Sequence, residues 1–129
     1  MVRHAIIQGG DPLSKDPAKA SQVGTGGLGV LRAEYSTEPF TRGAVGAALR
    51  PGQPDSGGAQ FFVCVTDTPE LDFGGRRNAD GQGFAAFGRV VSGMDVIKKI
   101  QAAPINEAAT GSARQTLTPP IAILKAHRK

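Results

Sequence analysis

Cysteine, histidine and tryptophan are scarce in this chain of 129 residues, which has one cysteine, two histidines and no tryptophan. A single cysteine cannot form a disulfide within the chain, so Cys64 gives no sign of an oxidising compartment. It lies in an apolar run and is predicted to be a small core residue. His4 and His127 stand near the two chain ends without acidic or cysteine partners in a ligand pattern. Neither a metal site, nor Cys–His catalysis, nor a cofactor is therefore expected.

Long hydrophobic runs are also missing, so the sequence predicts neither a signal peptide nor a transmembrane span, and no membrane partner. If Met1 is the natural start, a cytoplasmic location is expected; a signal peptide upstream would make the protein periplasmic. The net charge of +4 is modest, and no basic stripe with interleaved aromatic residues is present. We therefore expect a monomer with a solvated charged surface and no nucleic-acid partner.

The residues that are abundant favour short strands and turns. Glycine and proline contribute 18 and 9 residues, and 40% of the chain is hydrophobic, which is typical of one globular domain spanning residues 1–129. Strands are predicted at residues 3–8, 28–35, 43–49, 59–65, 84–90 and 121–124. An exposed loop is expected at 11–27 and a helical turn at 69–73. The fold class is therefore mainly β, a barrel or sandwich with a helical cover.

One amphipathic helix is predicted over residues 92–103. Ser92 and Asp95 have the spacing of a capping box, and Pro104 ends the helical pattern. Val96, Ile97, Ile100 and Ala103 would form its apolar face.

Two glutamines at strand ends are the most informative feature. Gln8 precedes a Gly-Gly pair, and Gln60 follows one and leads into the apolar run that begins with Phe61 and Phe62. Neighbouring residues of a strand point to opposite faces, so one phenylalanine can fill the core while the other lines a groove. Such a groove, with amide donors and apolar walls, suits an extended peptide. The alternative for each glutamine is a buried residue with a structural role only.

Two further motifs have simpler explanations. Residues 24–29 match G-x-G-x-x-G, but a polar loop precedes them, and no acidic residue follows at the spacing of a dinucleotide site. A mobile flap is expected there. Residues 78–81 resemble part of a calcium loop but lack its first and last ligands, so an Asp-Gly turn is expected.

Several blocks, in order along the chain, make the sequence resemble the cyclophilins, which are peptidyl-prolyl cis-trans isomerases. They are Gln8-Gly9-Gly10-Asp11, Gly24-Thr25-Gly26-Gly27, Ser56-Gly57-Gly58-Ala59-Gln60-Phe61-Phe62, Leu71-Asp72 and residues 87–97. The resemblance implies a closed eight-stranded antiparallel barrel capped by helices. The family's first two strands and first helix have no counterpart here, and their loss would open the barrel.

The resemblance also implies site residues. A proline ring would enter a pocket lined by Phe62, Leu71 and Phe84, with Ile6 at its wall. Gln8, the one catalytic-site residue carried over, and Gln60 would bond the substrate backbone, and Leu49 and Arg50 would flank the residue before proline. Phe84 stands where the family commonly has histidine, and Glu70 where it often has an aromatic residue.

The implied activity is rotation of X–Pro bonds in peptides and in unfolded or folding proteins, without a cofactor. The family places its catalytic arginine in an F-H-R-V-like segment upstream of the glutamine that corresponds to Gln8, and only seven residues precede Gln8. Arg3 lies in a different segment. Two interpretations follow: a part of a longer cyclophilin, weak or inactive alone, or a complete module that binds proline peptides without turning them over.

Overall fold

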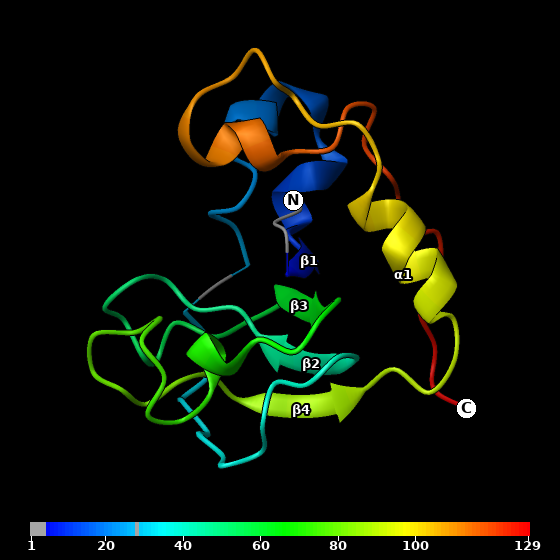
Figure 1. The fold of residues 1–129 in the computed structure, drawn as a ribbon. Coiled ribbons are helices and arrows are strands. Elements are labelled where there is room, and N and C mark those ends of the chain that lie inside the picture. The colour runs from blue at the N-terminus through cyan, green and yellow to red at the C-terminus, as the bar shows by residue number, and fades with distance from the viewer. Residues whose placement is uncertain (1–4, 28) are drawn as a thin grey trace.

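A computed structural model describes residues 5–27 and 29–129, and a small antiparallel sheet organises them (Figure 1). Its four strands lie in the order β1-β3-β2-β4. They are β1 (Ile6–Gly9), β2 (Ala44–Ala47), β3 (Phe61–Cys64) and β4 (Ala86–Arg89). The α-helix α1 (Met94–Gln101) lies beside the sheet, and short 3-10 helices cover Pro12–Lys15, Pro17–Gln22, Pro69–Leu71 and Gly111–Gln115.

The strand register decides which side chains share a face. Gln8 pairs with Phe62, and Phe62 pairs with Gly46 on its other side. Because paired residues project from the same face of a sheet, this face also carries Ile6 and Cys64, which pair with each other. It packs into a core formed by Phe40, Ala44, Ala48, Phe62, Cys64 and Leu71, with Ile6, Phe84 and Ala86 against it. Cys64 is fully buried, as predicted.

The sheet is open, and β1 and β4 form its edges. The mainly β fold with one helix matches the sequence prediction, and the described residues do not close a barrel. An open sheet is the arrangement expected when two strands of the family's barrel have no counterpart. The four strands are shorter than their predicted ranges, and β1 is half-buried rather than buried. Arg3 and His4, in the predicted strand 3–8, lie outside the described residues.

Two predicted strands do not form. In the range 28–35, Leu28 lies outside the described residues, and Leu31 makes only an isolated bridge with Gly57. In the range 121–124, no ladder is present and Leu124 is 95% exposed. Apolar residues favour a strand only where a neighbouring backbone and a buried face are available. Neither segment has both.

The helix is shorter than predicted, and its start differs. Gly93 is the N-cap residue, with φ of 91° and no capping side chain, so the predicted capping box at Ser92 is wrong. A left-handed φ suits glycine because it has no Cβ. Val96, predicted on the apolar face, is 51% exposed, while Ile97 and Ile100 are half-buried. The predicted helical turn after Pro69 is confirmed as a 3-10 helix.

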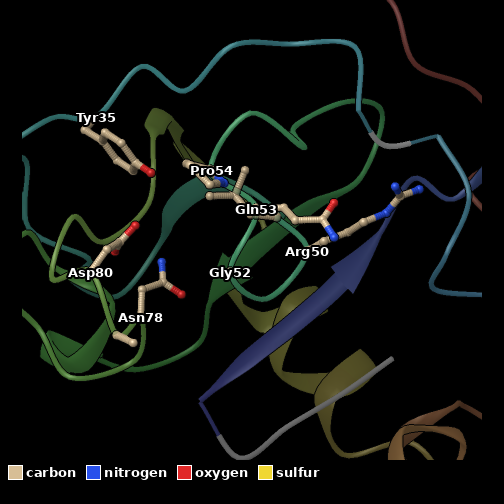
Figure 2. A pocket seen from close by; sticks show the side chains of 9 residues that line it. Tyr35, Arg50, Gly52, Gln53, Pro54, Asn78 and Asp80 are labelled. Carbon is tan, nitrogen blue, oxygen red and sulfur yellow. The ribbon is translucent and has the colours of Figure 1, made fainter.

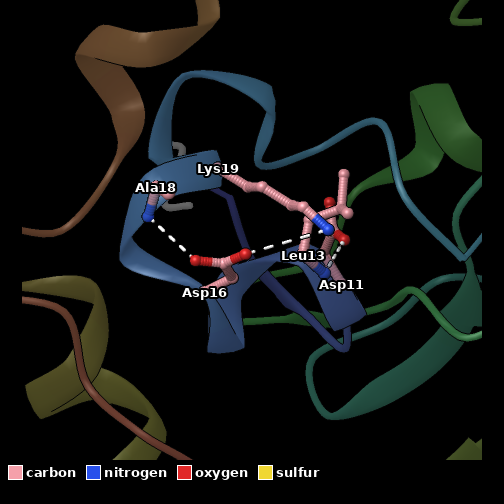
Figure 3. Close-up of polar contacts among 5 residues, drawn as sticks. All are labelled: Asp11, Leu13, Asp16, Ala18 and Lys19. Carbon is pink, nitrogen blue, oxygen red and sulfur yellow. Dashed lines mark hydrogen bonds and ion pairs between the residues drawn. The ribbon is translucent and has the colours of Figure 1, made fainter.

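Residues 11–27, predicted to be a loop, contain the first two 3-10 helices. Asp11 and Asp16 cap them, since their Oδ1 atoms accept hydrogen bonds from the backbone amides of Leu13 (2.8 Å) and Ala18 (3.0 Å). Figure 3 shows these caps and the ion pair between Lys19 and Asp16. A proline follows each aspartate, and aspartate at the N-cap with proline at the first helical position is a strong helix start.

Candidate functional site

The two glutamines predicted from the sequence meet on one face of the sheet. Nε2 of Gln8 donates to Oε1 of Gln60 at 2.9 Å. The register places Gln8 opposite Phe62, and Gln60 lies two residues earlier on the same side of the chain, diagonal to Gln8. Gln60 is only 2% exposed, and its Nε2 donates to the carbonyl of Gly26 at 2.6 Å. The buried amide thus joins the sheet to the glycine-rich loop.

Asp11 also binds the glycine-rich loop. It was not singled out from the sequence as a site residue. Its Oδ2 accepts hydrogen bonds from the amides of Gly24 (2.5 Å) and Gly26 (3.1 Å) and lies 3.4 Å from Nε2 of Gln60. The segment predicted to be a mobile flap is therefore tied to a buried carboxylate. The signal that could have found this anchor is the aspartate-proline pair after Gly10, which marks a helix cap.

A first cavity, of about 340 Å³, is lined in part by this network, through Gln8, Gly24 and Gln60. Four of the eight predicted site residues line it: Gln8, Leu49, Arg50 and Gln60. Nη2 of Arg50 donates to the carbonyl of Thr25 at 3.3 Å, which directs the guanidinium toward the glycine-rich side. The other lining residues are Gly24, Thr25, Ala48, Pro51 and Gln53. The arrangement can present a charged donor and the Gln8 side chain to an extended peptide, while the buried Gln60 amide is held by internal hydrogen bonds.

The other four predicted residues belong to the core. Phe62 is 3% exposed, and its ring centroid lies 5.4 Å from that of Phe40 and 5.5 Å from that of Phe84. Leu71 is buried, and Ile6 packs against the same cluster. Of the two adjacent phenylalanines, Phe62 therefore fills the core and Phe61 is half-buried. The role of this cluster in receiving a proline ring stays a prediction.

Figure 2 shows the residues that line a second cavity, of about 190 Å³. The two cavities share Leu49, Arg50 and Gln53 as lining residues. Tyr35, Asn78 and Asp80 face it from the other side, and Gly52, Pro54 and Ala79 complete the lining. The predicted turn after Asn78 is present, because the amide of Gly81 donates to the carbonyl of Asn78. This second cavity was not predicted from the sequence.

Among residues 5–27 and 29–129, two groups have a shifted pKa. Burial, and to a smaller extent the charge of Asp80 and then of Asp55, raises the pKa of the Tyr35 hydroxyl. Burial also raises the pKa of the Cys64 thiol. Across residues 5–27 and 29–129, no three histidine, cysteine or acidic side chains gather as metal ligands would. Within the same ranges, no helix has the length and apolar character needed to cross a bilayer.

Known proteins resemble this chain in sequence and in fold. A family model described as cyclophilin type peptidyl-prolyl cis-trans isomerase/CLD matches residues 1–128. Relatives from Brucella abortus (strain 2308) and Brucella suis biovar 1 (strain 1330), each named a probable peptidyl-prolyl cis-trans isomerase, are 42% identical over 97 residues. The aligned region is 74% of this chain and 43% of each relative, so the chain spans less than half of their length.

A solved structure shares the fold. The cyclophilin type peptidyl-prolyl cis-trans isomerase of Cryptosporidium parvum, crystallised in the presence of the dipeptide Ala-Pro, superposes with a TM-score of 0.63 at 21% identity. The superposition covers 88% of this chain and 62% of that one.

Proposed function

Because this chain belongs to the cyclophilin family of peptidyl-prolyl cis-trans isomerases, we propose that it binds proline-containing peptides and accelerates rotation about their X–Pro bonds. The observation that supports this most is the first cavity, where Gln8, Gln60 and the Arg50 guanidinium gather beside the sheet. The proposed substrates are peptides and unfolded or folding proteins. A monomer that acts without a cofactor is part of the same proposal.

The proposed chemistry needs no nucleophile. An X–Pro amide rotates over a barrier of about 20 kcal/mol that arises from resonance between nitrogen and carbonyl. No bond breaks, so a catalyst has only to bind the twisted amide more tightly than either planar form. Hydrogen bonds from a charged donor are stronger than neutral ones and suit this task.

In this proposal, Arg50 is the charged donor for the peptide. Among the described residues that line the first cavity, it is the only cationic one. Its bond to Thr25 is long, at 3.3 Å, and the side chain is exposed, so the guanidinium can exchange that carbonyl for one of a peptide. Leu49 would contact the residue before proline, and Gln8 would orient the peptide backbone. The proline ring would enter at the apolar cluster of Phe62, Leu71, Phe84 and Ile6.

A module that binds without catalysis is the second candidate. The burial of Phe62 favours it, because a ring that is 3% exposed gives the proline ring no preformed pocket, and a peptide held by its backbone alone would bind without its X–Pro bond being twisted. The internal hydrogen bonds of Gln60 favour it as well. The isomerase and the binding module would bind a peptide in the same place, and only the isomerase would accelerate rotation of its X–Pro bond.

Exchange spectroscopy by NMR on a short Ala-Pro peptide tests the proposal. Exchange between cis and trans is slow without a catalyst, taking tens of seconds or more at 25 °C. We expect the folded chain to accelerate it, and Gln8→Leu to lower kcat/KM about tenfold, the effect of losing one strong hydrogen bond. The matched control is Gln22→Leu, which removes an exposed glutamine that does not line the cavity.

The outcomes separate the candidates. Acceleration that Gln8→Leu weakens and Gln22→Leu leaves unchanged supports the isomerase. Binding of the peptide without faster exchange supports the binding module. A folded chain that neither binds the peptide nor accelerates exchange contradicts both.

A further inference from the structure

The second cavity has room for a side chain and lies next to the proposed peptide site. Its volume of about 190 Å³ far exceeds the roughly 10–15 Å³ that one water needs. Leu49 and Gln53 line both cavities and separate them. Successive side chains of an extended peptide point to opposite sides. A peptide lying across this shared wall can therefore place one side chain in each cavity.

The lining of the second cavity is amphipathic. Leu49, Pro54 and Ala79 supply apolar surface, while Tyr35 and Asp80 supply a hydroxyl and a carboxylate. Figure 2 shows these two polar groups on the side of the cavity away from the Arg50 guanidinium. Arg50 points toward Thr25, to which it donates a hydrogen bond. The cation that lines both cavities is therefore directed out of this one.

The charges around the cavity favour a cation. Burial raises the pKa of the Tyr35 hydroxyl most, and the negative charges of Asp80 and then Asp55 add to this effect, so both carboxylates act on the hydroxyl at this cavity. Oδ1 of Asp80 accepts the amide of Gln82 at 3.0 Å, which fixes the carboxylate at the turn. Within residues 5–27 and 29–129, no basic side chain lies within ion-pair distance of Asp80. A fixed carboxylate at an apolar recess is a complement for a side chain with an apolar stem and a cationic end.

We propose that the second cavity is a specificity subsite that takes a lysine or arginine side chain of a bound proline peptide. The inference rests on the proposed peptide binding in the first cavity and adds a preference for basic sequences near proline. The apolar stem of the side chain would lie along Leu49 and Pro54. The cationic end would reach the Asp80 carboxylate and the Tyr35 hydroxyl.

A matched peptide series tests this subsite. Peptides of one length, neutral apart from one position, carry lysine, glutamine or glutamate in turn at each of the three residues before proline. Binding is followed by amide chemical shifts and turnover by exchange spectroscopy, in the whole chain. We expect lysine to be preferred over glutamine by about two- to fivefold at one position, the range for a solvent-exposed ion pair. Glutamate should be the weakest, and added salt should reduce the preference.

Asp80→Asn is the decisive variant. Its side-chain oxygen can still accept the Gln82 amide, so the turn keeps its hydrogen bond while the charge is lost. The ratio of lysine to glutamine peptides should fall to about one in this variant. Glu107→Gln makes the same change of charge at an exposed position in the connection after α1, away from the cavity, and should keep the wild-type ratio.

Failure of the subsite differs from failure of the proposed function. Lysine preference in binding or turnover that Asp80→Asn abolishes supports the subsite, even if turnover is absent. Equal binding and turnover of the lysine and glutamine peptides at every position overturn the subsite and leave the proposed function standing. The subsite is also overturned if Glu107→Gln loses the lysine preference as fully as Asp80→Asn does. The preference would then depend on net charge and not on the cavity. A folded chain that binds no peptide overturns both.

Discussion

Gln8 in β1 and Gln60, the residue before β3, are in contact, and the side-chain amide of the first donates to the side-chain carbonyl oxygen of the second at 2.9 Å. The same Gln60 amide donates to Gly26, so one buried side chain connects β1, β3 and the glycine-rich loop. The candidate groove is thus built on a polar network inside the fold. A change at Gln60 would therefore affect both the stability of the fold and the proposed peptide binding.

We predict that Gln60→Leu destabilises the chain more than Gln8→Leu. Leucine at position 60 removes the side-chain donor to the carbonyl of Gly26 and one of the four donors to the buried carboxylate of Asp11, and it leaves Gln8 without its acceptor. An unsatisfied buried polar group costs about 1–3 kcal/mol. Urea unfolding of both variants measures the difference, and an equal or larger loss for Gln8→Leu would contradict the network.

Asp11→Ala should release the glycine-rich loop. The carboxylate accepts hydrogen bonds from the amides of Leu13, Gly24 and Gly26, so its removal leaves these three amides without their acceptor. Hydrogen exchange at these amides should accelerate beyond the change in global stability. Asp16→Ala is the control, because Asp16 caps only the amide of Ala18. Unchanged exchange at Gly24 and Gly26 in Asp11→Ala would show that the loop is held by something else.

Phe62→Ala should lower the free energy of unfolding by about 3–5 kcal/mol, as large-to-small changes at buried aromatic residues do. The ring packs between Phe40 and Phe84, which would lose their contacts. Phe87→Ala removes the same atoms at a position that is 65% exposed, and its effect should stay within about 0.5 kcal/mol. Similar losses in the two variants would mean that Phe62 does not fill the core.

Stability should fall at alkaline pH through Cys64. Burial raises the pKa of its thiol, so the folded chain keeps the proton while the unfolded chain releases it from about pH 8.5. The free energy of unfolding therefore declines as pH rises above this value toward the folded pKa. Cys64→Ala removes the group and should show a shallower decline between about pH 8 and 10 in urea unfolding. Parallel declines in the two proteins would contradict the assignment.

The parts of the fold set by local pattern could be predicted from sequence. Three elements lie near their predicted places: the strand that begins at Phe61, the strand that contains Gln8, and the helical turn after Pro69. The segments at 28–35 and 121–124 have strand-like composition, but their described residues, 29–35 and 121–124, pair with no strand. Pairing depends on distant backbone, so composition alone could not decide it.

The site was predicted in part for a similar reason. The Gly-Gly neighbours of Gln8 and Gln60 marked both residues, and the structure brings them into contact. Which side of β3 faces the core depends on register, and here Phe62 takes that side. The Asp-Pro pair marks Asp11 as a helix cap, but its bonds to Gly24 and Gly26 join residues 13 and 15 positions apart, and no local motif predicts those. The second cavity joins residues 35, 49–54 and 78–80, which only the tertiary fold places together.

The most direct test of the account is a titration of the isotope-labelled chain with an Ala-Pro peptide and with its Ala-Ala counterpart, followed by backbone amide shifts. We predict that the proline peptide perturbs the amides of Gln8, Thr25, Leu49 and Arg50, around the first cavity, and that the alanine peptide does so more weakly. Equal responses to the two peptides, or shifts confined to residues outside this cavity, would contradict the central claim that the groove beside Gln8 and Gln60 recognises proline.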